Sequence, residues 1–220
     1  MMIIADLSPE SKTDYGLMNV LAHIYLSGDS DEIIIGNYIG DYVKGRDYLK
    51  YPEQIRRGII LHRNIDSFTD RHPVVQRSKI PFTRKYHKYA GVVVDILYDH
   101  FLTREWNLYS TRPLESVTYQ FYRAMVNNYE ILPAKVRDRM PFFIINNWIE
   151  SYRSISGLRK VFNTLSRRTS LPLETRYAIK TLKKNYYSLG DDFMEFFPQL
   201  IDYVENDFDI QISHNITIPF

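Results

Sequence analysis

Cysteine is absent from this 220-residue sequence. Its absence excludes a disulfide scaffold, thiolate-bound zinc, an iron–sulfur cluster and a cysteine nucleophile. Glycine is scarce, with nine residues, and this favours helices over a turn-rich sheet protein. No apolar run approaches the roughly 18–20 residues of a membrane span, and no secretory leader pattern is visible. We therefore expect a cytoplasmic protein that does not enter a membrane.

Positive and negative charges nearly cancel over the whole sequence, but they are unevenly distributed along it. The net charge of +2 excludes a strongly basic nucleic-acid binder, so we expect no nucleic-acid partner. Residues 52–89 carry nine Lys/Arg against three Asp/Glu, and residues 150–190 carry nine against two. Residues 191–220 carry seven acids and neither Lys nor Arg. Either these segments form helix faces that neutralise one another, or the basic ones dock an acidic partner.

Apolar residues recur at helical spacing from Met18 onward, and no set of alternating strands is visible. We predict an all-α protein with one helical domain over residues 18–209, preceded by an N-terminal extension (1–17, non-native or disordered) and followed by a C-terminal tail (210–220). After a first helix near Val20, the predicted helices are 31–43, 52–66, 87–106, 116–128, 141–152, 158–168, 174–185 and 191–208. The segment 69–73 reads as a polar junction.

Four predicted helices carry a polar pair with i, i+4 spacing in otherwise apolar surroundings. Residues four apart share one helix face, so each pair can direct two ligands at one point. The pairs are Asn19/His23, Asn37/Asp41, His62/Asp66 and Asp95/Asp99, and His100 follows the last.

Asp95 is the sharpest case, because it lies in a strongly apolar helix. A carboxylate buried alone costs several kcal/mol or stays protonated, so it requires a cation. The cation is either an arginine, for which Arg63 and Arg104 are candidates, or a metal. The same argument applies to Asp41. Imidazoles mixed with several carboxylates suit Mn²⁺, Fe²⁺ or Mg²⁺. Because no Glu-x-x-His pair occurs, phosphoester hydrolysis fits better than oxygen chemistry.

The spacing of these residues resembles that of the acyl carrier protein phosphodiesterase family. The similarity extends from Met18 to about Asp209 and is carried by Asn19-x-x-x-His23, Gly36-Asn37-x-x-x-Asp41-x-x-x-Gly45, Gly58-x-x-x-His62-Arg63-x-Ile65-Asp66-x-x-Thr69-Asp70 and Asp95-x-x-x-Asp99-His100-Phe101-Leu102. The resemblance implies an all-helical bundle related to the HD-domain phosphohydrolases and a divalent ion, with Mn²⁺ preferred and Mg²⁺ or Fe²⁺ as alternatives. It also implies removal of 4′-phosphopantetheine from holo-acyl carrier protein, a reaction of lipid metabolism. This sequence lacks the adjacent His-Asp doublet, since Asp99-His100 has the reverse order.

Carried over position by position, the resemblance suggests the site residues. Asp41, His62, Asp66 and Asp95 are expected to bind metal, and His23 to complete the site or contact phosphate. Asp99 and His100 are expected to orient ligands or move protons. Arg63 would steady the phosphate, or form an ion pair with Asp66 or Asp70. The acidic carrier protein would dock on basic residues, either Arg56, Arg57, Arg71 and Lys79 or Arg159, Arg167 and Arg168.

Two other functions remain open at this point. One is a metal-dependent phosphohydrolase acting on a nucleotide or another small phosphoester, which needs no protein-docking face. The other is a non-catalytic helical module that binds an acidic protein, with the Asp and His residues as hydrogen-bonding groups of the core.

Overall fold

A computed structural model describes residues 20–214, and within that range every regular element is a helix. The expected extension at residues 1–17, and Asn19, lie outside the described residues. The α-helices are α1 (Val20–Tyr25), α2 (Asp31–Ile39), α3 (Glu53–Arg71), α4 (Pro73–Tyr86), α5 (Ala90–Arg104), α6 (Trp106–Tyr109), α7 (Leu114–Asn127), α8 (Ala134–Ile145), α9 (Ile155–Arg168), α10 (Thr175–Lys184) and α11 (Tyr186–Phe208). Short 3₁₀ helices are η2 (Gly40–Tyr42), η3 (Asp47–Lys50), η4 (His87–Tyr89), η5 (Tyr129–Ile131) and η6 (Trp148–Arg153).

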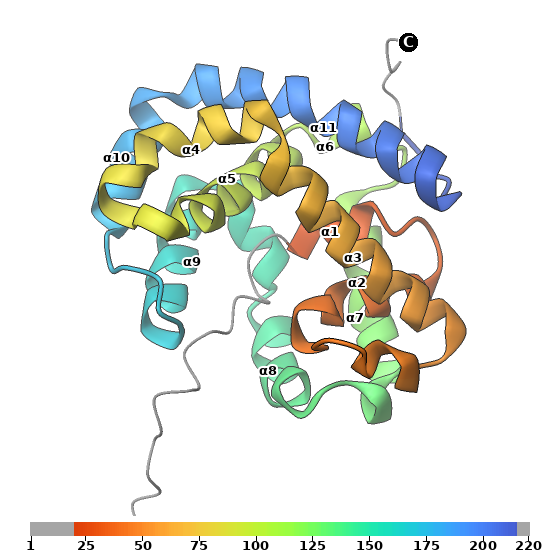
Figure 1. Ribbon diagram of the computed structural model, residues 1–220. Coiled ribbons are helices and arrows are strands. Elements are labelled where there is room, and N and C mark those ends of the chain that lie inside the picture. Colours follow the sequence, from red (N-terminus) through yellow and green to blue (C-terminus); the bar gives the residue numbers. More distant parts are fainter. Residues whose placement is uncertain (1–19, 215–220) are drawn as a thin grey trace, which may run out of the picture.

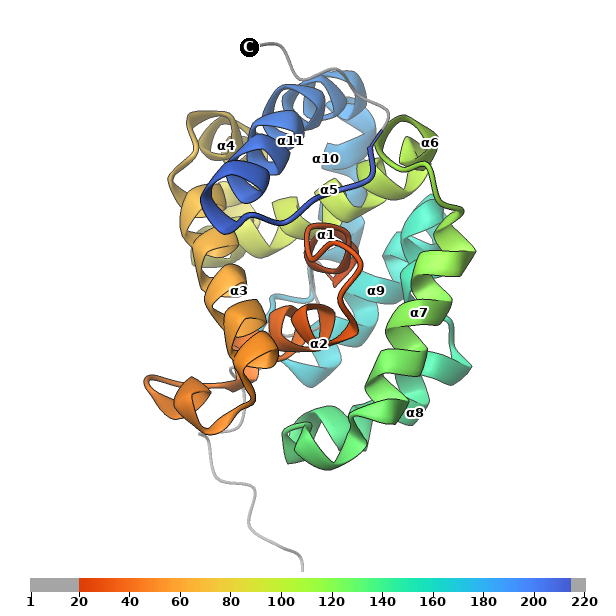
Figure 2. The same ribbon diagram turned by 90° about the vertical axis from the view of Figure 1, so that its right-hand side faces the viewer.

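The short helix α1 lies at the centre of the molecule (Figures 1 and 2). It packs against α2, α5 and α7, and all of its residues except Ala22 are buried. Helix α11 lies alongside α4 and contacts α3 and α5. This arrangement confirms the predicted all-α architecture. No helix in the described part of the chain is long and apolar enough to cross a membrane.

The predicted helix at 52–66 continues to Arg71, so the first three residues of the expected polar junction at 69–73 belong to it. The break falls at His72, because a residue that precedes proline is disfavoured in the α conformation and Pro73 is well suited to start a helix. Helix α4 follows directly and was not predicted. A helix was predicted to begin at Pro141, but α8 begins at Ala134 and contains that proline.

The start of the predicted C-terminal tail packs on the domain. Ile210 and Ile212 are buried, and the Ile212 amide donates a hydrogen bond to Glu205 Oε1 (3.0 Å). Residues 215–220 lie outside the described range.

Candidate metal centre and cleft

Two glycines bring α2 and α3 into backbone contact. A Cβ atom on Gly58 would lie 2.8 Å from the Asn37 nitrogen, and one on Gly36 would lie 2.9 Å from the Gly58 Cα. Gly40, just after α2, lies against the His62 ring in the same way. This close approach places the end of α2 and η2, with Asp41, beside His62 and Asp66 on α3.

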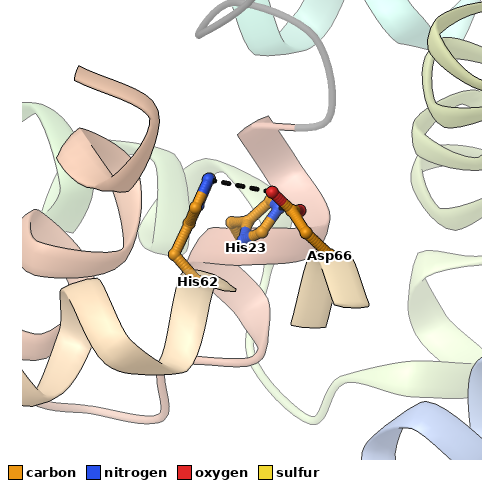
Figure 3. A group of neighbouring side chains, drawn as sticks. All are labelled: His23, His62 and Asp66. Atoms are coloured by element: carbon orange, nitrogen blue, oxygen red, sulfur yellow. Dashed lines mark ion pairs between the residues drawn. The ribbon is translucent and has the colours of Figure 1, made fainter. Parts of the chain in front are cut away.

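His23, His62 and Asp66 form the centre of the site (Figure 3). The His23 Nε2 atom lies 3.4 Å from Asp66 Oδ1, and His62 Nε2 lies 3.2 Å from Asp66 Oδ2. The two imidazole rings stack with centroids 4.4 Å apart. Asp41 Oδ1 lies 3.3 Å from the same His62 nitrogen. The structure thus brings together four of the five residues expected to bind metal.

The tautomer of His23 is fixed by Asn37. The Asn37 amide nitrogen donates to the His23 carbonyl (2.9 Å) and to Ser27 Oγ (2.9 Å), so its oxygen must face the His23 ring. His23 Nδ1 lies 2.6 Å from that oxygen and therefore donates to it. The other ring nitrogen, Nε2, faces Asp66, which is the arrangement of a metal-binding histidine whose second nitrogen is held by a hydrogen bond.

The electrostatics of this group call for a cation. His23 Nε2 and both ring nitrogens of His62 are buried without a well-formed hydrogen bond. Burial disfavours the imidazolium of His62, but Asp41 and Asp66 outweigh it and raise the pKa to about 10. Burial likewise opposes ionisation of Asp66, yet His23 and His62 hold its pKa well below its ordinary value. Two imidazoles with converging carboxylates are a donor set that fits a divalent metal ion.

An open cleft of about 600 Å³ leads away from this centre along α4. Asp41, Asp66 and Asp95 line it, with Asp70 beside them. Burial raises the pKa of Asp95 well above its ordinary value, and the neighbouring Asp66 and Asp70 add to the shift. A set of carboxylates that repel one another in this way is relieved by a bound cation. Asp95 therefore faces the same space as the other expected ligands.

Lys79 lies in the wall of the cleft and was expected on an outer docking surface. Its ammonium group is 3.0 Å from Asp70 Oδ1, and its side chain is only 16% exposed. Gly91 makes room for it, since a Cβ there would lie 3.2 Å from Lys79 Cε. The spacing of Gln76, Lys79, Ile80 and Thr83 along one face of α4 could have revealed this wall, had α4 been predicted.

Asp99 does not face the cleft. Its two carboxylate oxygens accept hydrogen bonds from the Leu21 amide (3.1 Å) and the Ala22 amide (3.0 Å) in the first turn of α1. Burial raises the pKa of Asp99 to about 8, although these two amide hydrogen bonds oppose the shift. Asp99 therefore positions the helix that carries His23, rather than handling protons at the site.

His100 lies elsewhere in the fold, because it is one residue further round α5 than Asp99. Its Nδ1 atom donates to the Tyr152 carbonyl (2.7 Å), and its Nε2 lies 3.0 Å from the Tyr186 hydroxyl. Both ring nitrogens are used within the core. We assign His100 a structural role in place of the catalytic role expected from the sequence.

Arg63 does not reach toward the cleft either. Its guanidinium donates to the Val43 carbonyl (2.9 Å) and lies 5.2 Å from the centre of the Tyr48 ring. It forms no ion pair with Asp66 or Asp70. Arg63 thus fixes the segment that follows Asp41.

The remaining basic residues are spread over three places. Arg71 ends α3 beside the cleft residue Asp70. Arg56 and Arg57 lie near the start of α3, where Arg57 donates to the Phe208 carbonyl at the end of α11. The other three lie on α9, none of them lining the cleft: Arg159, Arg167, and Arg168, which stacks on Phe142.

Comparison with known proteins identifies the family. Residues 18–200 match the sequence model of the acyl carrier protein phosphodiesterases. The chain belongs to the acyl carrier protein phosphodiesterase family. A relative of that name from Enterobacter sp. strain 638 is 31% identical over 198 residues, covering 86% of this chain and 98% of the relative. Relatives of the same name from Photorhabdus laumondii and Yersinia pestis are 27% and 26% identical, over 86% and 84% of this chain and 96% of each relative. No solved structure matches the chain.

Proposed function

We propose that this protein hydrolyses the phosphodiester between 4′-phosphopantetheine and the carrier serine of holo-acyl carrier protein. The observation that carries the proposal is the pair of buried imidazoles, His23 and His62, whose Nε2 atoms face Asp66 at an open cleft without a well-formed hydrogen bond. Membership of the family supplies the substrate class. Water adds to phosphorus, the bond from phosphorus to the serine oxygen breaks, and that oxygen takes up a proton. The products are apo-carrier protein and 4′-phosphopantetheine.

A divalent ion, Mn²⁺ by preference and Mg²⁺ or Fe²⁺ as alternatives, would be held by His23, His62 and Asp66. Asp41 and Asp95 border the same space and are the further ligands we propose. When bound, the ion supplies Lewis acidity toward the phosphate and activates water. Asn37 orients His23, and Asp99 anchors the helix that carries it.

Lys79 takes the role that the sequence suggested for Arg63. Its partly buried ammonium borders the end of the cleft that the carboxylates line, which we call the acidic end. There it can leave its ion pair with Asp70 and pair with a phosphate oxygen of the substrate. Arg71, which follows Asp70 at the end of α3, is the residue we propose to contact the acidic carrier protein. The remaining basic residues predicted to dock it lie further from the cleft.

The test is an intact-mass assay of holo-acyl carrier protein with Mn²⁺. We expect the wild-type chain to remove the phosphopantetheine mass, and Asp66→Asn to lower the rate at least about a hundredfold, since it weakens a metal ligand. Asp207→Asn, an exposed acid on α11, is the matched control and should retain full activity.

Metal binding is read separately. Mn²⁺ should raise the melting temperature of the wild type and of Asp207→Asn, but not that of Asp66→Asn. If holo-carrier protein is left unchanged while nucleotides are hydrolysed, the proposed substrate is wrong and the proposed metal centre stands. Absence of both turnover and a thermal shift would leave only a binding module.

A further inference from the structure

The cleft extends past its carboxylates along one face of α4, and beyond Lys79 this face has no part in the proposed hydrolysis. That face follows i, i+3, i+4 and i+7 spacing, which aligns side chains along one side of a helix. It consists of Gln76, Lys79, Ile80 and Thr83, and His87, which directly follows the end of α4, also lines the cleft. The opposite face of α4, with Phe82 and Tyr86, is buried in the core. We call the part of the cleft beyond Lys79 the distal trough; it is lined by Ile80, Thr83, His87, Lys88, Ala90 and Val92.

The dimensions of the cleft fit a long, thin ligand. From Gln76 to Tyr86, the last residue of α4, the helix axis rises about 15 Å, and His87 follows directly. The volume of about 600 Å³ is that of an ordinary small-molecule site. The pantetheine chain has twelve bonds from the phosphate oxygen to sulfur and spans about 14 Å when extended, by analogy with extended peptide backbone.

The lining chemistry also favours such a chain. Ile80, Ala90 and Val92 offer apolar surface, while Thr83, Gln76 and His87 offer hydrogen-bonding groups. Pantetheine alternates a dimethyl-substituted carbon and methylene pairs with two amides and a hydroxyl. Among residues 20–214, no Phe, Tyr or Trp lines the cleft, although aromatics make up 15% of the sequence. A nucleotide base would lack the aromatic platform on which bases commonly stack.

His87, in the distal trough, has an unusual backbone. Its φ of 48° and ψ of −123° lie in a region that non-glycine residues rarely adopt. Strain of this kind persists where the surrounding structure maintains it, and it clusters at ligand sites. Glycine would adopt this conformation freely, so the imidazole is held here at an energetic cost.

We propose that the distal trough binds the pantetheine arm of the holo-carrier protein while its phosphate lies at the acidic end. This inference rests on the proposed function. It assigns specificity to α4: the arm is recognised along Ile80, Thr83 and His87, and the metal centre acts only on the phosphodiester at its end.

The test compares binding of holo- and apo-carrier protein in the presence of EDTA, so that hydrolysis is prevented. We expect the wild type to bind the holo form about tenfold tighter or more, an increment of about 1.4 kcal/mol or more. Thr83→Trp fills the trough and should abolish this preference while leaving affinity for the apo form unchanged. Arg84→Trp places the same side chain on the adjacent, exposed position outside the cleft and should retain the preference.

A second variant guards against a folding artefact. His87→Gly removes the ring and relieves the backbone, so its melting temperature should equal or exceed that of the wild type while the holo preference falls. Turnover of bis(p-nitrophenyl) phosphate, which has no arm, should be unchanged in Thr83→Trp and His87→Gly.

The outcomes separate the two proposals. If the wild type removes phosphopantetheine but Thr83→Trp and His87→Gly retain the holo preference, the arm binds elsewhere and the trough assignment is wrong. If the wild type neither hydrolyses the holo form nor prefers it to the apo form, both proposals fail.

Discussion

Imidazole is used in two different ways in this protein. In His23 one ring nitrogen is held by Asn37, and the other faces Asp66, where a metal ion could bind to it. In His100 both nitrogens are used, by the Tyr152 carbonyl and the Tyr186 hydroxyl. Only an imidazole of the first kind can serve as a metal ligand without first losing a hydrogen bond.

His100→Gln should therefore reduce stability but not the rate of catalysis. Burial lowers the pKa of His100 and Arg104 adds to the shift, although the Tyr152 carbonyl opposes it. As the pH falls below about 6.5, the unfolded chain takes up a proton that the folded chain does not, so the wild type loses stability. We expect the free energy of unfolding of the wild type to exceed that of His100→Gln by about 1–2 kcal/mol near pH 7. This difference should become smaller toward pH 5.

Urea unfolding of both proteins at several pH values measures this difference, and kcat on holo-carrier protein should stay within about twofold. A hundredfold loss of kcat in a folded variant would restore the catalytic role for His100.

The orientation of the Asp99 side chain could not be predicted from the sequence. Asp95 and Asp99 are one turn apart on α5, and the sequence predicts that both serve the same site. Their surroundings differ because the first turn of α1 lies over Asp99. The amides that bind Asp99 belong to Leu21 and Ala22, which are separated from it by 78 and 77 positions in the sequence. The i, i+4 spacing predicted that His62 and Asp66 share one face of α3, but not that Asp95 and Asp99 would meet different neighbours.

At the level of helices, the site depends on how closely α2 and α3 approach. Gly36 and Gly58 face each other across this interface, and neither position has room for a methyl group. Sequence periodicity predicted both helices but not their contact. It also missed α4, and with it the wall of the cleft, because proline and basic residues obscure its apolar face.

Gly58→Ala tests this interface. We expect it to lower the free energy of unfolding by about 1–3 kcal/mol, because overpacking pushes α2 away from α3. It should also reduce the stabilisation given by Mn²⁺, since Asp41 moves relative to His62. The matched control is Gly190→Ala in α11, whose Cβ would lie 3.4 Å from Phe101 Cε1, an ordinary contact. It should be neutral or stabilising, as alanine favours helix by about 1 kcal/mol. Equal stability of the two variants would show that the interface between α2 and α3 can accommodate a methyl group at position 58.

Across the whole molecule, part of the uneven charge is neutralised internally. Arg77 on α4 pairs with Asp192 (2.6 Å) and Glu195 (2.6 Å) on α11, and Lys85 pairs with Glu174 (3.0 Å). Both interpretations of the charge pattern thus apply to different residues. Arg71, Arg159 and Arg167 form no ion pair with other residues in the range 20–214, and of these Arg71 directly follows the cleft residue Asp70 in the sequence.

Docking of the acidic carrier protein should therefore depend on Arg71 and on salt. We expect kcat/KM for holo-carrier protein to fall steeply with ionic strength, because screening lengths shrink to about 10 Å at 0.1 M. Arg71→Glu should lower kcat/KM about tenfold at low salt and flatten its salt dependence. Arg159→Glu makes the same charge change on α9 and should have little effect, and neither variant should alter turnover of bis(p-nitrophenyl) phosphate. If Arg159→Glu lowers kcat/KM more than Arg71→Glu does, the docking face lies on α9. If kcat/KM does not depend on salt, electrostatic docking is contradicted altogether.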